Sequence, residues 1–576
     1  MLGNYYYILI LLIFSLFLNL GIFPLFLEEP RRAVVALEMT LSGNYIVPTI
    51  MGELYFAKPP LFNWILILSS KLIGSFSEFA VRLPTVISLI LIGIFNYLFI
   101  QKYFNKEVAF FSSLIFMTSG TIYYYFSILG EIDIFYSLII YLCIISVIFF
   151  FTKNQLNYLY IFSFSFAGFG FLTKGFPSIV FLYGTLFFVF LIGKRFKNFF
   201  SIYHILGIFI FSLIVGFYFY FYNYYHPILD YLQFLWSESS SRTVVEENKI
   251  TSLAKHMFVF PLKTLIALLP WSFLILFLFR KNTLNEIFSN NFLKIALVVF
   301  LGNYFVYWIS PGANQRYIYM LYPFFIVIFI YFYFKYKNQD RVKEKFFNIF
   351  VLFIILVFDF ISLGLPFLIK TLPDVWTVSV GFKILVWIIG IIIALFIVLN
   401  KISVESGKIY NATLLCLGFL SIVILGALVY VIPVIWIISI SFSALFFILL
   451  IAGFKSEIKI VYLLISLIMF RILFDLVYFP VKSKSGDSYK EKINGVKVAE
   501  IANLQNTELF YYGDDKLPHG LLFYIERERH KILKRNLKIE KNYLYLSKAE
   551  YVKNYNIKKL FTFEIKKEKY VLFKVY

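Results

Sequence analysis

Apolar runs long enough to cross a membrane alternate with short polar breaks along most of the chain. As a helix, a run of about 20 apolar residues spans the roughly 30 Å hydrocarbon core of a bilayer. We expect spans at residues 5–27, 83–100, 108–128, 134–152, 157–173, 176–193, 200–222, 260–280, 291–309, 317–334, 347–369, 377–399, 410–431, 433–453 and 460–480. Residues 410–453 are divided only by Pro433, and residues 134–193 contain short runs. The pattern therefore predicts about 13 to 15 transmembrane helices.

Two segments after the first span have a different pattern. Residues 59–74 are short and interrupted by polar side chains, and they begin at a Pro-Pro break. We expect an amphipathic helix that lies in the membrane interface there, and a similar helix over residues 33–41.

The chain changes character after residue 480. Alternating apolar positions predict strands, and helical periodicity predicts helices. The expected strands are residues 507–512, 542–546 and 560–565, and the expected helices are residues 493–504 and 521–529. The sequence therefore predicts a membrane domain over residues 1–480 and a small α/β domain over residues 481–576.

Composition supports a polytopic membrane protein. The 576 residues are 61% hydrophobic and 22% aromatic, and the mean hydropathy is +0.82. In a soluble chain the net charge of +21 would suggest a nucleic-acid partner. Here much of the basic charge lies in short loops, so membrane lipids and no nucleic acid are expected as partners. Cys143 and Cys416 lie within apolar runs, which disfavours a cysteine-based zinc site.

Lysine and arginine are concentrated in alternate loops. The positive-inside rule places such loops in the cytoplasm. This orientation puts the N-terminus in the cytoplasm. The first loop and residues 481–576 then lie on the outer side of the membrane.

The expected outer loops carry ionic motifs that membrane anchoring does not require. They are LEEPRR (27–32), YFAKPP (55–60), AVRLP (80–84), GEID (130–133), TKG (173–175) and SPGANQRY (310–317), with a longer loop over residues 223–258. Carboxylates can act as general bases towards a hydroxyl or amine, and cations can stabilise a departing phosphate. The motifs favour an active site at the outer membrane boundary for a phosphate-linked lipid substrate.

The order of these motifs resembles the aminoarabinose transferase (ArnT) and protein O-mannosyltransferase group of membrane glycosyltransferases. The resemblance also uses SGNYIVP (42–48), LTKG (172–175) and LLPWS (268–272), and it covers about residues 1–330. It implies the GT-C fold, an all-α polytopic membrane protein, here with a small extracytoplasmic α/β C-terminal domain. It also implies an inverting sugar transfer from a polyprenyl-phosphate donor to a lipid A, envelope glycan or protein acceptor. No cofactor is expected, and the proposed transfer does not require a divalent metal.

The resemblance gives roles to individual residues. Glu28 and Asp133, with Glu29 beside them, would orient or deprotonate the acceptor. Lys58 and Arg242 would neutralise the carrier phosphate. Further expected phosphate-binding cations are Arg31, Arg82, Lys174 and Arg316, and expected substrate-binding residues are Tyr55 and Tyr317.

This chain departs from the family pattern at two of these motifs. Glu28 stands where the family has an aspartate. Ala57 replaces the glutamate of the family's YFEKP pattern, so no metal ligand is expected there.

Structural roles compete for several of these residues. Glu28 or Asp133 could cap a helix, and Lys174 could be an interfacial lysine with its ammonium group in water. Arg82 and Arg316 could be boundary anchors or ion-pair partners.

An alternative function is a lipid-linked glycan transporter or flippase, which would need polar groups near mid-span. Asp359, Arg471 and Asp475 are the deep candidates. Arg471 and Asp475 are spaced i, i+4 in the last span and are expected to neutralise each other.

Overall fold

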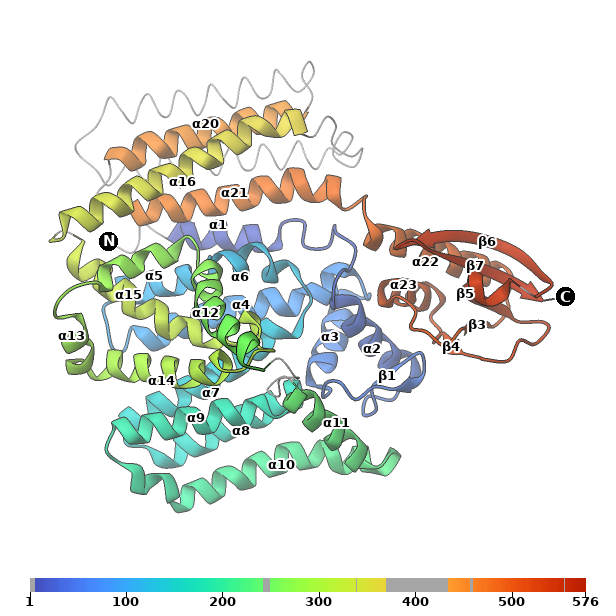
Figure 1. Ribbon diagram of the computed structural model, residues 1–576, viewed down its shortest axis with the longest axis horizontal. Helices are drawn as coiled ribbons and strands as arrows, with labels where there is room; N and C mark the ends of the chain where they lie inside the picture. The colour runs from blue at the N-terminus through green and yellow to red at the C-terminus, as the bar shows by residue number, and fades with distance from the viewer. Residues whose placement is uncertain are drawn as a thin grey trace. The chain divides into compact units, whose positions relative to one another are not determined.

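The computed structural model describes residues 6–241, 249–337, 339–368, 434–455, 459–553 and 555–575. Figure 1 shows the helices and strands of the described residues. The chain forms two compact units. The first unit comprises residues 1–23 and 337–484, and the second comprises residues 24–336 and 485–576. The C-terminal segment after residue 484 thus belongs to the same unit as the expected outer loops.

The described residues of the first unit form apolar helices. They are α1 (Tyr6–Phe17), α16 (Arg341–Leu368), α20 (Val434–Lys455) and α21 (Lys459–Lys482). On α21, Arg471 Nε lies 2.7 Å from Asp475 Oδ2, and both side chains are buried. This confirms the expected mutual neutralisation. The expected spans at 377–399 and 410–431 lie outside the described residues.

Among the described residues, the second unit contains more helices than the first. The long apolar helices are α4 (Glu78–Ile100), α7 (Ile132–Thr152), α8 (Leu156–Lys174), α10 (Ile202–Tyr225), α14 (Asn291–Trp308) and α15 (Tyr322–Tyr336), and shorter helices include α5 (Lys106–Met117) and α9 (Pro177–Ile192). In the described part of both units, nine helices are long and apolar enough to cross a membrane, or ten if one bent pair is counted. The predicted polytopic helical fold is confirmed.

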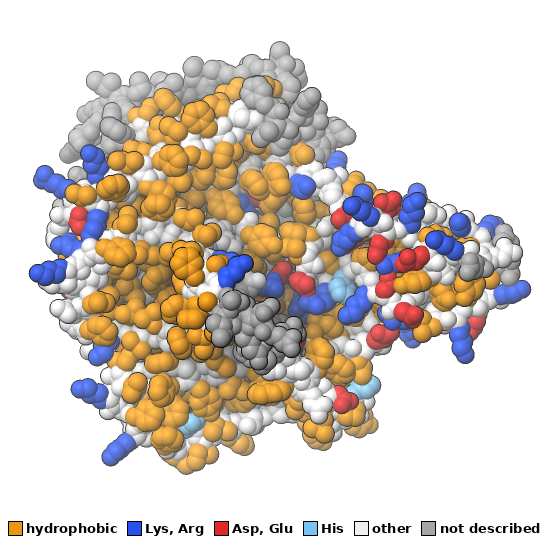
Figure 2. Space-filling view, viewed as in Figure 1, with side chains coloured by type: hydrophobic (Ala, Val, Ile, Leu, Met, Phe, Trp, Pro, Cys, Tyr) orange, Lys and Arg blue, Asp and Glu red, His pale blue; other side chains and the backbone are white. Residues whose placement is uncertain are grey.

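The surface of these helices is apolar. Figure 2 shows one face, on which hydrophobic side chains cover the helices of the second unit and charged side chains are densest over the C-terminal sheet. On α10, Phe209, Phe217 and Tyr220 are largely exposed. A soluble protein rarely leaves such a continuous apolar surface in water, so lipid is its natural environment.

Three expected spans are shorter or more divided than the pattern predicted. The helix expected over 5–27 ends at Phe17, and the one expected over 108–128 ends at Met117. The span expected over 260–280 bends by 112° between α12 (Lys249–Ala267) and the 3-10 helix η4 (Trp271–Leu278).

The second and third of these breaks contact each other. After α5, the N–H of Gly120 donates to Leu269 O at 2.8 Å, and Trp271 Nε1 donates to Thr118 O at 3.2 Å. Pro270 lacks an N–H, so a helix through this point would lose a backbone hydrogen bond. The polar groups of one break satisfy those of the other.

Two short helices and a hairpin lie between residue 27 and α4. The helices are α2 (Glu29–Ser42) and α3 (Leu61–Ile73), which agree with the two short helices expected here. The hairpin pairs β1 (Thr49–Ile50) with β2 (Glu53–Leu54) through Met51 and Gly52, both at positive φ. Glu38 on α2 closes the hairpin by accepting from the Thr49 hydroxyl at 2.7 Å and the Gly52 N–H at 3.1 Å.

The C-terminal segment combines helices with one mixed sheet. The helices are α22 (Asp487–Leu504) and α23 (His519–Arg529), and the strands are β3 (Leu509–Tyr512), β4 (Lys534–Arg535), β5 (Leu544–Lys548), β6 (Ile557–Ile565) and β7 (Glu568–Val575). The order is β4-β3-β5-β7-β6, with β3 parallel to β4 and β5 and the other pairs antiparallel. This confirms the predicted α/β character.

One hydrophobic core joins this segment to the first loop. Val34, Val35 and Leu37 of α2 pack in the same cluster as Leu521 and Leu522 of α23. Burial of this apolar surface stabilises the contact between α2 and α23.

Candidate functional site

The start of α7 and the end of α8 meet in a buried ionic cluster. Asp133, in the first turn of α7, forms an ion pair with Lys174, the last residue of α8, and the side chains are 4% and 9% exposed. Arg316 Nη1 lies 2.8 Å from Glu131 Oε2 and 3.8 Å from Asp133 Oδ2. We call Glu131, Asp133, Lys174 and Arg316 the Asp133 cluster. It brings together three of the expected site residues.

Aromatic rings complete the surroundings of Lys174. Its ammonium nitrogen lies 4.8 Å from the centre of the Tyr136 ring and 5.2 Å from the centre of the Tyr317 ring. Cation–π attraction favours a charged ammonium in this place. Lys174 is thus an inward-facing partner of Asp133, and Tyr317 lies beside it. Glu131 stands at the N-cap of α7 but makes no side-chain capping hydrogen bond.

Glu131 is a member of the cluster that sequence reasoning did not select. Burial and the neighbouring Asp133 carboxylate raise the pKa of Glu131 above its ordinary value, although Arg316 opposes the shift. The GEID motif contained the signal, since two carboxylates one residue apart precede an apolar run. Only the second carboxylate was assigned a role.

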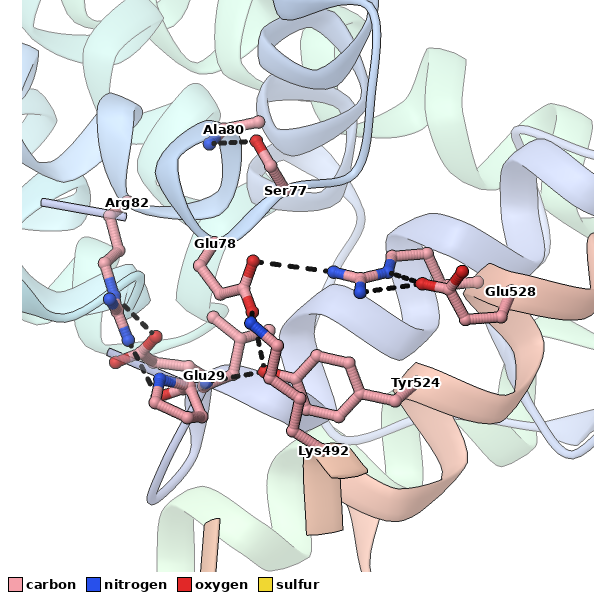
Figure 3. A network of polar contacts seen from close by, with 11 residues as sticks. Glu29, Ser77, Glu78, Ala80, Arg82, Lys492, Tyr524 and Glu528 are labelled. Atoms are coloured by element: carbon pink, nitrogen blue, oxygen red, sulfur yellow. Dashed lines mark hydrogen bonds and ion pairs between the residues drawn. The ribbon is translucent and has the colours of Figure 1, made fainter. Parts of the chain in front are cut away.

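A second buried pair joins α2 to α4. Arg82 Nε lies 3.1 Å from Glu29 Oε2, the side chains are 2% and 0% exposed, and Arg82 Nη2 donates to Pro24 O at 3.1 Å (Figure 3). Burial raises the pKa of Glu29 to about 7, and the Arg82 charge opposes this rise. One turn further along α4, the Thr85 hydroxyl donates to Glu131 O at 3.4 Å. α4 thus connects the Glu29–Arg82 pair to the Asp133 cluster.

Glu28 and Arg31 form a more exposed pair. Glu28 stands at the N-cap of α2 but makes no side-chain capping hydrogen bond. It is ion-paired instead with Arg31, and both side chains are partly exposed. The next residue, Arg32, is buried and donates to the Tyr55 hydroxyl at 2.8 Å. Adjacent residues of one motif therefore contact different parts of the first loop.

Helix α11 (Ile228–Ser241) holds the YFAKPP loop. Lys58 Nζ lies 2.8 Å from Glu238 Oε1, and the Tyr231 hydroxyl donates to Lys58 O at 2.8 Å. The sequence pattern predicted a long outer loop over residues 223–258 and gave Glu238 no role, whereas the structure places Glu238 on α11. Arg242 follows the last residue of α11 and lies outside the described residues.

The same helix approaches the end of α8. Leu235 of α11 packs with Phe171 and Leu172 of α8 in one hydrophobic cluster. A Cβ added at Gly175 would lie 3.9 Å from Leu235 Cδ2. α11 therefore lies against both the loop that carries Lys58 and the helix that carries Lys174.

In the part of the chain that the structure describes, no three His, Cys, Asp or Glu side chains gather in an arrangement that could hold a metal ion.

Comparison with known proteins places these motifs in context. Residues 57–220 match the model of the dolichyl-phosphate-mannose-protein mannosyltransferase family. The chain is 39% identical over 92 residues to undecaprenyl phosphate-alpha-4-amino-4-deoxy-L-arabinose arabinosyl transferase 2 of Proteus mirabilis, a match that covers 16% of each chain. It is 33% identical over 170 residues to arabinosyl transferase 1 of the same organism, covering 27% of this chain and 30% of that one. These matches span less than a third of each of the two relatives.

Structural similarity extends over the whole chain. The crystal structure of ArnT from Cupriavidus metallidurans bound to undecaprenyl phosphate matches with a TM-score of 0.65 at 12% identity, covering 99% of this chain and 98% of that one. The apo structure of the same protein matches with a TM-score of 0.64 at 14% identity. The expected GT-C fold and the resemblance to the ArnT and protein O-mannosyltransferase group are confirmed.

Proposed function

We propose that this chain is an integral-membrane glycosyltransferase that transfers a sugar from a polyprenyl-phosphate donor. The observation that carries the proposal is the Asp133 cluster, in which two carboxylates and two cations are buried together at the ends of membrane helices. Taking charges out of water costs free energy that pairing them often does not fully recover. A function in catalysis gives a reason for this cost, and the similarity to arabinosyl transferases indicates which reaction to test.

The proposed reaction is a single displacement at the anomeric carbon of the sugar. The acceptor oxygen or nitrogen forms a bond to that carbon as the bond from the carbon to the phosphate oxygen breaks. A carboxylate takes the acceptor proton, and the carrier leaves as polyprenyl phosphate with the bonding electron pair. Such a step needs a positioned base and cations near the departing phosphate.

We assign acceptor orientation or deprotonation to Asp133, together with Glu28 and Glu29. Lys174 and Arg316 hold the Asp133 carboxylate in its ionised form, because nearby cations favour the charged state of an acid. We propose contact with the donor phosphate as a second role of Lys174 and Arg316, after their role in pairing with Asp133.

We propose that Lys58 and Arg242 bind the carrier phosphate. Arg31 and Arg82 are proposed as further phosphate-binding cations. Tyr55 and Tyr317 are proposed to contact the substrate. Lys58 is held by a carboxylate, Glu238, at 2.8 Å. A phosphate oxygen can take the place of that carboxylate oxygen, because both are anionic acceptors of comparable geometry. Donor binding would then exchange one charge-assisted contact for another.

We also propose the placement in the cell. The protein lies in the bacterial inner membrane with its N-terminus in the cytoplasm, a membrane domain over residues 1–480 and an extracytoplasmic domain over residues 481–576. The acceptors to test are lipid A, an envelope glycan and a protein hydroxyl.

The transporter alternative gains little from the structure. The deep residues that it would use have protein partners, because Asp359 accepts from the Ser443 hydroxyl and Arg471 pairs with Asp475. We therefore place transfer first.

The test uses the purified full-length chain with radiolabelled undecaprenyl-phosphate sugars and each acceptor. Label should move to one acceptor in the parent, and Asp133→Asn should lower the rate by about a hundredfold or more. Asp475→Asn is the matched control, because it also removes one carboxylate from a buried ion pair but lies in the other unit. Absence of transfer with every donor and acceptor, together with passage of labelled donor across proteoliposomes, would support the transporter instead.

A further inference from the structure

A hydroxyl group of the C-terminal segment lies at the junction of α2 and α4. Tyr524 is buried on α23, and its hydroxyl donates to Glu78 Oε1 at 3.0 Å (Figure 3). The same oxygen accepts the N–H of Leu25 at 3.0 Å. One hydroxyl thus connects the chain just before α2 with the first residue of α4.

The Glu78 carboxylate is fixed from the same side. Lys492 Nζ on α22 lies 2.6 Å from Glu78 Oε1, and Arg527 Nη1 on α23 lies 3.5 Å from Glu78 Oε2 (Figure 3). Among the described residues, the three side chains that donate to this carboxylate belong to the C-terminal segment. A buried carboxylate that accepts several charged donors has little freedom to move.

A chain of contacts leads from Tyr524 to the buried pair of the candidate site. The Pro24 carbonyl and the Leu25 N–H belong to one planar peptide group. Arg82 donates to that carbonyl at 3.1 Å, and Tyr524 accepts from that N–H. Arg82 in turn pairs with Glu29 at 3.1 Å. Tyr524 and Arg82 therefore hold opposite ends of the same peptide.

The helix repeat of α4 provides a second connection between Tyr524 and Arg82. Glu78 and Arg82 are one turn apart on α4 and so lie on the same face. Tyr524 binds the first through its hydroxyl and reaches the second through the Pro24–Leu25 peptide. The Tyr524 hydroxyl is thus connected to Arg82 by two routes, through Glu78 on the same helix and through the Pro24–Leu25 peptide.

We infer that Tyr524 is a positioning residue for the proposed transfer. Its hydroxyl, which belongs to the C-terminal segment, orients the Glu29–Arg82 ion pair. The inference rests on the proposed function. The attachment of the segment itself relies on the hydrophobic core shared by α2 and α23, to which the Tyr524 ring belongs. The hydroxyl therefore contributes orientation, and it can be removed while the ring remains in the core.

The test compares Tyr524→Phe with Tyr570→Phe in the full-length protein. Tyr570 is also buried in the C-terminal segment, and its hydroxyl donates to a carboxylate, Glu568, at 2.8 Å. That contact lies within the sheet and reaches no residue of the first loop. Because catalysis is sensitive to small misplacement, Tyr524→Phe should lower kcat by about ten- to a hundredfold, with the donor KM changed by less than about twofold. Tyr570→Phe should stay near the parent.

A second measurement does not depend on activity. Hydrogen–deuterium exchange of peptides covering residues 24–32 should become faster in Tyr524→Phe, because the Leu25 N–H loses its acceptor. The same peptides should exchange at the parent rate in Tyr570→Phe. Faster exchange with unchanged kcat would overturn the positioning role, and so would equal loss of kcat in both variants.

Two further outcomes can be told apart, namely a Tyr524→Phe variant that does not fold and a parent protein that transfers no sugar. If Tyr524→Phe fails to fold, Lys492→Met takes its place, since it removes another donor from Glu78 while the partly exposed stem of the lysine is kept. It should lower kcat in the same direction, and parent-like kcat would overturn the inference. A parent that transfers no sugar contradicts the proposed function itself, whereas faster exchange at residues 24–32 still reports the Tyr524 contact.

Discussion

Asp133 and Lys174 form a buried ion pair between the start of one helix and the end of the next. α7 and α8 are consecutive and pack against each other, and this packing brings the two termini together. The two residues also differ in their other neighbours. Asp133 has a second cation nearby, Arg316 at 3.8 Å, whereas the other neighbours of Lys174 include the rings of Tyr136 and Tyr317.

The first prediction concerns this pair. Asp133→Asn should destabilise the protein more than Lys174→Met, because Asp133 keeps Arg316 when Lys174 is removed. The loss for Asp133→Asn should be about 3 kcal/mol, typical of leaving a buried charge without its partner. The double variant should lose less stability than the two single losses added together, by at least about 1 kcal/mol in the free energy of unfolding. Unfolding of the purified variants in detergent measures all three values, and a reversed order would contradict the arrangement.

The second prediction concerns pH. The pKa of Glu29 is about 7 in the folded protein because of burial, compared with 4.5 for an ordinary glutamate. Between these values the folded chain binds a proton that the unfolded chain has released, so stability falls as pH rises and levels off above about pH 7. The total fall from this group should be about 3 kcal/mol.

Glu29→Gln provides the control for that measurement. It should remove this part of the slope and leave the contributions of other buried carboxyl groups in place. The free energy of unfolding of parent and variant, measured from pH 4.5 to 8, gives the difference. Parallel curves would show that Glu29 does not titrate in this range.

The third prediction concerns the carrier phosphate. Lys58→Met and Arg242→Met should each weaken binding of undecaprenyl phosphate by about ten- to a hundredfold, the factor that corresponds to losing one charge-assisted contact. Lys71→Met on α3 is the matched control, because it removes an exposed lysine of the same outer-loop region. Isothermal titration measures the affinities. Parent-like binding in both site variants would mean that the phosphate lies elsewhere.

The partner of Lys58 offers an independent check. Glu238→Gln should bind the carrier phosphate at least as tightly as the parent, because Glu238 competes with phosphate for the Lys58 ammonium. Weaker binding would mean that Glu238 positions Lys58 and does not compete.

The fourth prediction concerns topology. Single cysteines at Glu53 and Asp514, both exposed, should react with an impermeant thiol reagent in intact spheroplasts. A cysteine at Lys197, in the exposed loop between α9 and α10, should not react. The background carries Cys143→Ser and Cys416→Ser. The opposite labelling pattern would invert the proposed orientation.

Much of the fold follows from local patterns in the sequence. Long apolar runs determine helices such as α7 and α10 because unpaired backbone groups are too costly in lipid. The strands β3, β5 and β6 were recognisable from their alternating side chains. The pattern missed β7, which carries charged residues at its start, and β4, which is only two residues long. It also missed the breaks after Met117 and Ala267, because their polar groups are satisfied by each other across the fold.

The sequence by itself determined the polytopic helical class, the C-terminal α/β segment and the residue types available for chemistry. Residue order and hydrophobicity carry this information because helix and strand periods and the cost of burying charge are local properties. Only the tertiary structure decided the partners. It separated Glu28 from Glu29, paired Lys174 with Asp133, and placed Tyr524 against a peptide almost 500 residues earlier in the chain. Such pairs are set by helix packing, which brings together side chains that no sequence spacing relates.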